Sequence, residues 1–268
     1  MNPKTSIVIL AFANTNSDGS IVVDSVNFPS NLVKTWKSTG KKVILSVGGQ
    51  NGHWDTVFAS ENNINNFIKT VSAALTQFNL DGVDLDIEAY TATPRTVANT
   101  IMRLKTAIGK KLLIVSPECV TVYEGTPVPS PDVGGQAWNY FVPIIQLVDK
   151  YIDLYQPQAY NNWYGGLPGG SVAYLKEVYL NWRNLPSSIP WTNPIPGFLG
   201  VDGNKLLLGV LASSSAGGAA YYAPPSVIGE VRGWLKANNY PLKGFMVWDS
   251  NWDKKNNFQI SDACTQNI

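Results

Sequence analysis

Four carboxylates stand inside an apolar segment, FNLDGVDLDIEAY at residues 78–90: Asp81, Asp84, Asp86 and Glu88. Side chains alternate between the two faces of a β-strand, so the last three acids share one face and the apolar residues between them share the other. Three neighbouring carboxylates in an interior of low polarity cannot all ionise cheaply, and we expect at least one to keep a proton near neutral pH. A protonated carboxyl group beside ionised carboxylates is the arrangement that general acid catalysis uses.

Two other uses of such a row of acids are weaker hypotheses. An edge strand can carry charges that prevent aggregation, but this strand is fully apolar on its second face, unlike short, polar edge strands. Stacked Asp and Glu can also bind Ca²⁺ or Mg²⁺, yet residues on one straight strand seldom surround a cation, and a chain with 1 histidine offers few further ligands. The sequence therefore favours catalysis without a bound metal or another cofactor.

The histidine and the cysteines argue against several other catalytic schemes. His53 would have to serve any Ser-His-Asp or Cys-His arrangement, and no G-x-S-x-G motif accompanies it, so we interpret it as an ordinary loop residue. Cys119 and Cys264 are too few for a disulfide scaffold or a cysteine-rich zinc site. We interpret both as buried thiols rather than as one disulfide.

The elements that must position the acids alternate between short β-branched runs and helical patterns, which is typical of parallel β/α units. The predicted strands are residues 5–13, 41–49, 82–88, 111–118, 152–160, 205–213 and 244–250. The predicted helices are residues 28–40, 61–78, 94–109, 135–150, 171–184 and 225–238. Long loops at 119–134 and 161–170 follow the C-terminal ends of strands, where a β/α barrel builds its active site, and 185–203 is a long proline-rich return after a helix.

This alternation runs through the chain without a Gly/Ser linker or a change in composition, so we predict one domain over residues 1–268. A doubly wound open sheet is the competing architecture. It normally has a glycine-rich phosphate loop, and SVGGQNG at 46–52 matches neither the G-x-G-x-x-G nor the G-x-x-x-x-G-K-[ST] pattern.

Composition excludes several classes of partner. The formal net charge is +1 and 15% of residues are charged, which argues against nucleic acid or an anionic membrane as a partner. No apolar run approaches the roughly 20 residues that span a bilayer, and MNPKTSIVIL lacks the pattern of a signal peptide. With 9 Trp and 12 Tyr, the chain is suited to flat apolar ligands such as the faces of sugar rings. We expect a monomer.

The segment DGVDLDIE (81–88) resembles the D-G-x-D-x-D-x-E signature of glycoside hydrolase family 18, the chitinases and their relatives. Four further segments are similar to motifs of this family and occur in the family order: SVGG (46–49), SPE (116–118), QPQAYNN (156–162) and GFMVWD (244–249). The resemblance covers essentially the whole chain. It implies a (β/α)8 TIM-type barrel that acts on polymers of N-acetylglucosamine, with secretion to the extracellular space.

The resemblance also implies roles for individual residues. Glu88 would protonate the glycosidic oxygen and then activate water, while Asp86 would orient the substrate's N-acetyl group, whose carbonyl oxygen attacks the anomeric carbon. Retention of configuration follows from this substrate-assisted mechanism. Asp84 would share charge and a proton with Asp86. Tyr160 would donate a hydrogen bond to the N-acetyl oxygen, and Trp248 would form the apolar floor under the sugar.

Five other residues are weaker candidates for contact with substrate. Asn161 stands where many members of the family have Asp, so the resemblance leaves open whether it adjusts the acid. Gln158 lies two residues before Tyr160 and shares its face of the strand. Ser46 and Gly48 are candidates both for the substrate site and for close packing of their strand. Trp163 could stack on a sugar or pack against its own loop, and the same alternatives apply to Trp54, Trp252 and Tyr222.

Three functions remain open. The leading hypothesis is a chitinase that cuts β-1,4 linkages in chitin or chitooligosaccharides. An endo-β-N-acetylglucosaminidase acting on N-linked glycans would use the same acids. A chitinase-like lectin would bind without cleaving, but such proteins typically lose the acid, and Glu88 is present here.

The chain departs from the family at its first strand. Seven strands are predicted, and IVILAFA resembles the second strand of the family, which carries an Ala-Phe pair, rather than its first. A barrel without one strand has unpaired backbone groups at two edges. We therefore expect a barrel lacking its first strand, opened or atypically closed between residues 5–13 and 244–250.

Overall fold

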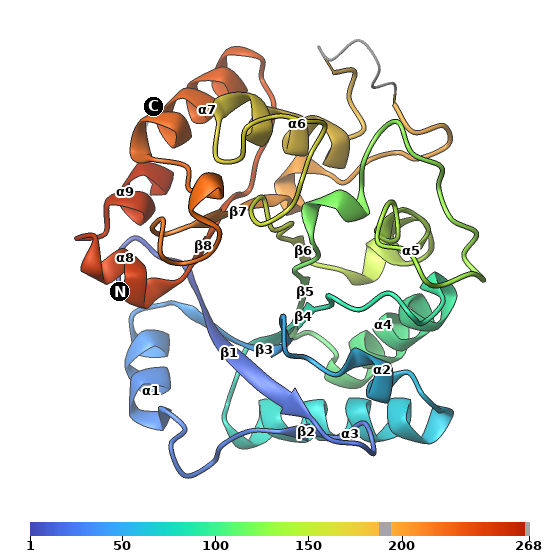
Figure 1. Cartoon of the computed structure of the whole chain (residues 1–268). Helices are drawn as coiled ribbons and strands as arrows, with labels where there is room; N and C mark the ends of the chain where they lie inside the picture. The colour runs from blue at the N-terminus through green and yellow to red at the C-terminus, as the bar shows by residue number, and fades with distance from the viewer. Residues whose placement is uncertain (188–193, 266–268) are drawn as a thin grey trace. The chain divides into compact units, whose positions relative to one another are not determined.

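The computed structural model describes residues 1–187 and 194–265 (Figure 1). By its internal contacts the chain divides into two compact units. The β1–β5 unit comprises Ser6–Pro117 and Pro129–Leu154, and the β7–β8 unit comprises Met1–Thr5, Glu118–Val128 and Tyr155–Ile268. That residues 1–268 make one domain stays a prediction.

The β1–β5 unit is built on a mostly parallel sheet. Its strands are β1 (Ile7–Thr15), β2 (Ile21–Val22), β3 (Lys42–Gly48), β4 (Gly82–Asp86) and β5 (Leu112–Val115), in the order β2-β1-β3-β4-β5. All pairs are parallel except the short β2, which runs antiparallel to the end of β1. Every residue of β4 is buried, as expected for a parallel strand that is covered on both faces.

Helices follow the strands of this unit. They are α1 (Ser30–Ser38), α2 (Trp54–Val57), α3 (Glu61–Gln77), α4 (Pro94–Ile108) and α5 (Phe141–Val148), with a 3-10 turn η2 at Asp149–Tyr151. Helices α3 and α4 lie side by side (Figure 1). Each begins at a hydroxyl that accepts a backbone hydrogen bond, Ser60 from Asn63 N–H and Thr93 from Thr96 N–H, which stabilises the first turn.

The β7–β8 unit has its own parallel strand pair, β7 (Leu207–Leu211) and β8 (Gly244–Trp248). Strand β6 (Leu154–Tyr155) begins at the last residue of the β1–β5 unit and ends at Tyr155, the first residue of the last segment of the β7–β8 unit. The helices are α6 (Val172–Trp182), α7 (Pro225–Ala237), α8 (Ser250–Lys255) and α9 (Gln259–Thr265), with 3-10 turns η1 (Cys119–Thr121), η3 (Gly203–Lys205) and η4 (Ala219–Tyr221).

All seven predicted strands are present, but most are shorter than predicted. The strand predicted over 82–88 ends at Asp86, and the strand predicted over 152–160 is reduced to Leu154–Tyr155 with an isolated bridge at Gln158. Pro157 explains the second difference, because proline has no N–H to donate to a neighbouring strand. The predicted helix at 135–150 begins only at Phe141, and α2, α8 and α9 were not predicted.

No additional parallel strand lies within 119–134 or within the described part of 185–203, from which 188–193 are excluded. Any strand at 188–193 would fall outside the described residues. The seam between residues 5–13 and 244–250 stays a prediction.

Two aspartates connect neighbouring strands at the N-terminal edge of the sheet. Asp81 N–H donates to the Val43 carbonyl (2.8 Å), and Asp81 Oδ2 accepts from Val43 N–H (2.9 Å). Asp153 makes the same pair of bonds with Leu113, at 2.9 and 2.8 Å. Lys37 Nζ lies 3.2 Å from Asp81 Oδ1. The first aspartate of DGVDLDIE thus has a structural role, fixing β4 against β3.

We expect Asp81→Ala to lower the free energy of unfolding by about 1–3 kcal/mol, because it removes the acceptor for a backbone N–H and leaves that donor unsatisfied. Urea unfolding followed by far-UV circular dichroism would measure the loss. Asp81→Asn is the matched control: it keeps an oxygen acceptor and should cost clearly less. Equal losses for the two variants would show that the acceptor is not what matters.

Candidate active site

The acid row, meaning Asp84, Asp86 and Glu88, begins deep in the β1–β5 unit. Asp84 is 2% exposed and accepts hydrogen bonds from two serine hydroxyls, Ser46 Oγ at 2.6 Å and Ser116 Oγ at 2.5 Å. Ser46 is the register partner of Asp84 on β3, and Ser116 directly follows β5 on the other side. Both oxygens of this carboxylate are therefore held by neighbouring strands, which fixes its orientation.

Asp86 ends β4 and is 8% exposed. Its carbonyl oxygen accepts from Trp54 Nε1 (2.7 Å) and from Gly49 N–H (3.0 Å). Trp54 is 1% exposed, so of its two predicted alternatives the structure supports packing rather than sugar binding. A Cβ on Gly48 would lie 2.2 Å from the Asp86 carbonyl oxygen and 2.4 Å from Trp54 Nε1. The glycines of SVGG thus allow a tryptophan to reach the backbone of the acid row.

Gly48→Ala should destabilise the β1–β5 unit, because the methyl group would overlap a backbone oxygen and because φ at this position is +109°. Gly40→Ala is the matched control, with φ of +81° and nothing within 4 Å of the added Cβ. We expect Gly48→Ala to lower the free energy of unfolding by about 1–3 kcal/mol more than the control, which is the usual cost of overpacking. Chemical denaturation of both variants checks this, and equal losses would contradict the packing argument.

Glu88 lies two residues beyond the end of β4 and is half-buried. The row therefore changes from two buried aspartates within the strand to a partly accessible glutamate in the loop that follows it. Loops after the C-terminal ends of strands carry the catalytic residues of β/α barrels. The partial exposure of Glu88 would allow its carboxyl group to contact a substrate, while Asp84 and Asp86 stay buried beneath it.

The other predicted residues belong to the β7–β8 unit. Gln158 (6% exposed) bridges Glu118 and Gly209 through backbone pairing, and Tyr160 (5% exposed) follows on the same segment. Asn162 Nδ2 donates to the Tyr160 carbonyl (3.1 Å). The two side chains expected to share a face are thus both buried after β6.

Two tryptophans of this unit differ in exposure. Trp248 is the last residue of β8 and is half-buried, and its carbonyl accepts from Ala212 N–H (2.7 Å). Trp163 is 58% exposed, with its ring centroid 6.4 Å from that of Tyr123. Burial, and then the nearby carboxylates of Glu177 and Glu124, raise the pKa of Tyr123, so this ring stays neutral behind the tryptophan.

Asn161, a predicted candidate for contact with substrate, is exposed, and its Oδ1 accepts from Gly218 N–H at 2.7 Å. Tyr222 and Trp252 are half-buried, and Lys255 Nζ lies 4.0 Å from the centroid of the Trp252 ring. The contact between Asn161 and Gly218 could not be predicted from the sequence, because the two residues lie on different loops.

The residues considered for other chemistries have ordinary environments. His53 is exposed and precedes α2, as predicted for a loop residue. Both cysteines are free thiols, as predicted; Cys119 is buried, whereas Cys264 is partly exposed as a residue although burial raises the pKa of its thiol to about 12. Burial raises the pKa of the Cys119 thiol to about 12, which keeps it protonated and unreactive as a nucleophile.

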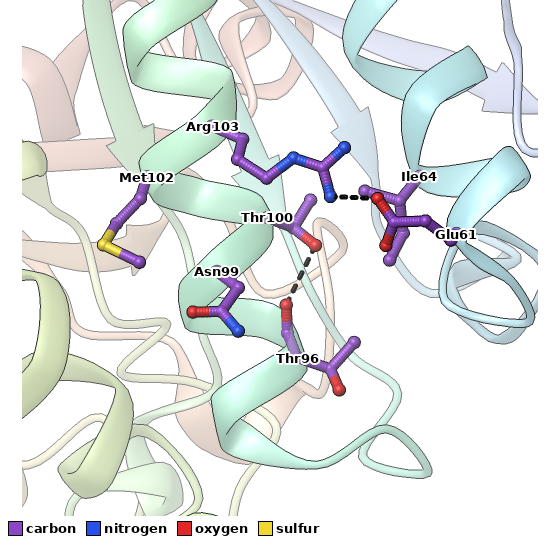
Figure 2. Close-up of a pocket in the computed structure, with 7 residues that line it drawn as sticks. All are labelled: Glu61, Ile64, Thr96, Asn99, Thr100, Met102 and Arg103. Carbon is purple, nitrogen blue, oxygen red and sulfur yellow. Dashed lines mark hydrogen bonds and ion pairs between the residues drawn. The ribbon is translucent and has the colours of Figure 1, made fainter.

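A cavity of about 270 Å³ lies between α3 and α4 (Figure 2). The Arg103 guanidinium beside it binds Glu61 Oε1 (2.6 Å) and Asn65 Oδ1 (2.5 Å). The two charged residues that line this cavity, Arg103 and Glu61, form an ion pair with each other. No residue of the acid row lines the cavity. Within residues 1–187 and 194–265, no group of three or more His, Cys, Asp or Glu could hold a metal ion.

Ser116 and Trp54 are the supporting residues that the sequence analysis did not assign to the acid row. The sequence signal for Ser116 was its place in SPE at 116–118, a segment similar to a family motif, whereas its position two residues after Ile114, the register partner of Asp84, is visible only in the structure. No signal of this kind existed for Trp54, whose ring crosses from a separate helix.

Among known proteins, the model of the family described as Glycosyl hydrolases family 18 matches residues 2–216. Chitinase ChiA of Flavobacterium johnsoniae is 27% identical over 281 residues, covering 87% of this chain and 17% of ChiA. Chitinase D of Niallia circulans is 27% identical over 266 residues, covering 85% of this chain and 48% of chitinase D. The chain thus spans less than half the length of these two relatives.

Solved structures show the same similarity in three dimensions. A family GH18 chitinase from Chromobacterium violaceum superposes with a TM-score of 0.77 at 22% identity, covering 97% of this chain and 75% of that one. A fungal endo-beta-N-acetylglucosaminidase of family 18 gives a TM-score of 0.73 at 18% identity, covering 98% and 88%. These similarities confirm the predicted TIM-type barrel as the fold class.

Proposed function

We propose that this chain, which belongs to the glycosyl hydrolases of family 18, is a chitinase that hydrolyses β-1,4 linkages between N-acetylglucosamine units with retention of configuration. The observation that carries the proposal is the intact acid row, with Asp84 and Asp86 buried in β4 and Glu88 half-buried just beyond it. The relatives named chitinase support the substrate class.

Glu88 is the proposed general acid and base. It donates a proton to the glycosidic oxygen as the bond breaks, and it then removes a proton from the water that completes hydrolysis. Partial exposure supports this role, because the carboxyl group must reach both a substrate oxygen and a water molecule.

Asp86 and Asp84 are proposed to act on the internal nucleophile. Asp86 holds the N-acetyl group so that its carbonyl oxygen attacks the anomeric carbon, and it stabilises the positive charge of the resulting oxazolinium ion. Asp84 sits deeper and shares a proton with Asp86. The hydrogen bonds from Ser46 and Ser116 support the role of Asp84, since they hold both of its carboxylate oxygens in place.

The remaining proposed contacts come from the β7–β8 unit. Tyr160 donates a hydrogen bond to the N-acetyl oxygen, Gln158 contacts substrate or the acids, and Trp248 packs under the sugar ring. Tyrosine and tryptophan suit these tasks because each combines an apolar face with a polar edge. Trp163 is proposed as a further stacking surface, which its 58% exposure supports.

An endo-β-N-acetylglucosaminidase is the second candidate function, favoured by the structural similarity to such an enzyme of the same family. The same acids would serve both reactions, and only the shape of the substrate groove would differ. A non-hydrolytic lectin is the third, and the presence of Glu88 argues against it.

One comparison of activities separates these functions. Purified protein is incubated with chitohexaose and, separately, with a high-mannose glycopeptide, and products are identified by mass spectrometry. We expect rapid cleavage of chitohexaose, with the β-anomer as the first product by NMR. Preferred cleavage of the glycopeptide would establish the second function, and tight binding of chitohexaose without turnover would establish a lectin.

The proposed site of action is extracellular, by analogy with the family, with chitin or chitooligosaccharide as the partner and a monomer as the active form. In the described part of the chain, no helix is both long and apolar enough to cross a lipid bilayer.

A further inference from the structure

Two loops of the β7–β8 unit are joined by one side chain. The first follows β6 and begins at Asn161, and the second follows β7 and includes Gly217 and Gly218. Asn161 Oδ1 accepts the Gly218 N–H at 2.7 Å, across 57 positions of sequence. The Asn161 backbone has φ of +58°, a left-handed conformation that asparagine tolerates better than most residues.

The second loop is fitted closely around this amide. A Cβ at either Gly217 or Gly218 would lie 3.0 Å from Asn161 Oδ1. Gly218 itself has φ of −63°, so alanine there would be unstrained in its backbone and would disturb only the contact with Asn161 and the Tyr221 ring. Close approach of Asn161 therefore accounts for glycine at both positions, together with the Leu211 side chain at Gly217, where an added Cβ would lie 2.9 Å from Leu211 Cδ2.

A second contact joins the same loops further along. A Cβ on Gly169 would lie 2.4 Å from Tyr221 Cδ1, so glycine at this position lets the tyrosine ring pack directly on the backbone of the first loop. The Tyr221 ring also meets the Tyr174 ring edge-on, with centroids 5.9 Å apart. The two loops thus pack against each other, and Asn161 Oδ1 and the Tyr221 ring both lie close to Gly218.

These loops carry three aromatic side chains that are partly or largely exposed. Trp163 stands two residues after Asn161, and Tyr221 and Tyr222 are half-buried on the second loop. Flat aromatic faces bind sugar rings, and their affinity depends on being held in one orientation before the ligand arrives.

We propose that Asn161 is a positioning residue that favours the binding of long substrates. By fixing the second loop to the first, it orients Trp163 and Tyr221 to contact N-acetylglucosamine units beyond those at the cleaved bond. The inference rests on the proposed function. It differs from the role in adjusting the acid that the sequence resemblance leaves open for Asn161, because the amide oxygen is already engaged by a backbone N–H and the amide carries no charge.

Two substitutions isolate the oxygen acceptor. Asn161→Gly keeps the left-handed backbone but removes the acceptor, whereas Asn161→Asp keeps both. Asn239→Gly is the matched control, since Asn239 is also left-handed, with φ of 53°, and is exposed after α7. For chitohexaose we expect Asn161→Gly to raise KM by about fivefold to tenfold, the effect of one net hydrogen bond, with kcat within about twofold. For a chitobiose derivative of 4-methylumbelliferone, which is too short to reach the proposed distal contacts, the same substitution should change KM by less than about twofold.

Asn161→Asp and Asn239→Gly should behave like the wild type with both substrates. If Asn161→Asp instead shifts the acidic limb of the kcat profile against pH while KM for chitohexaose is unchanged, the residue acts on the acid and the proposal is wrong. Equal changes in KM for the short and the long substrate would also overturn it.

Hydrogen exchange followed by mass spectrometry tests the loop contact independently of turnover. Exchange in peptides covering 213–222 should be faster in Asn161→Gly than in the wild type, and unchanged in Asn161→Asp. Unchanged exchange in Asn161→Gly overturns the positioning role even in a fully active enzyme. A wild type that neither cleaves nor binds chitohexaose overturns the proposed function, and with it the effect on substrate length, whatever the exchange rates.

Discussion

Replacing Glu88 with glutamine is expected to lower kcat on chitohexaose by about 10²–10⁴-fold, the usual contribution of general acid–base catalysis. Glutamine has nearly the shape of glutamic acid, but its amide protons are too weakly acidic to be transferred to the glycosidic oxygen. Because Glu88 is half-buried in a loop beyond β4, the amide can be accommodated, and binding of the substrate should be little changed. Steady-state kinetics and calorimetric titration with chitohexaose measure the two effects separately.

Glu230→Gln is the matched control for this experiment, since Glu230 is exposed on α7 and has no proposed role. Its kcat should stay within about twofold of the wild type, as for most surface substitutions. If Glu88→Gln retained more than about a tenth of the wild-type kcat, the assignment of the acid would be wrong. Loss of thermal stability in Glu88→Gln alone would point instead to a structural role.

Asp86→Asn should lower kcat by about 10²–10³-fold, a typical effect of removing one group that stabilises charge in a transition state. The amide cannot balance the positive charge of the oxazolinium ion, and it holds the N-acetyl group less firmly. Affinity for a thiazoline derived from chitobiose, which mimics that intermediate, should fall much more than affinity for chitobiose, because catalysis depends on complementarity to the transition state.

Asp55→Asn provides the control for Asp86→Asn, since Asp55 is exposed in the first turn of α2. It should leave both kcat and thiazoline binding unchanged. A variant at Asp86 that raised KM with an unchanged kcat would contradict the substrate-assisted mechanism, because it would show that the carboxylate binds substrate and transition state equally well.

The order of elements and the strand that carries the acids could be predicted from local pattern. Alternation along 82–88 placed the acids on one face, and β-branched runs located each strand, because both signals depend on near neighbours in the sequence. The errors came from competing local chemistry. Pro157 interrupts the predicted strand at 152–160, and the last two residues of 82–88 lie beyond the final register pair, Gly48 with Asp86.

Exposure of the aromatic residues could not be predicted in this way. Trp54 and Trp163 both follow strand ends in the sequence, yet one is 1% and the other 58% exposed. The difference arises because Trp54 lies in α2, where its indole N–H reaches the Asp86 carbonyl, whereas Trp163 lies on a loop with Tyr123 behind it. Burial depends on which segments arrive from elsewhere in the chain, and periodicity carries no information about that.

By itself the sequence determined the family, the β/α order and the identity of the acid row, since a strand of alternating acids and apolar residues fixes its own two faces. Only the tertiary structure decided what holds those acids. Ser46 and Ser116 meet at Asp84 from positions 38 and 32 residues away, and Asn161 meets Gly218 across 57. Such contacts form when parallel strands and their loops are brought side by side. Their hydrogen bonds therefore depend on register and on close approach at glycine, which no local stretch of residues specifies.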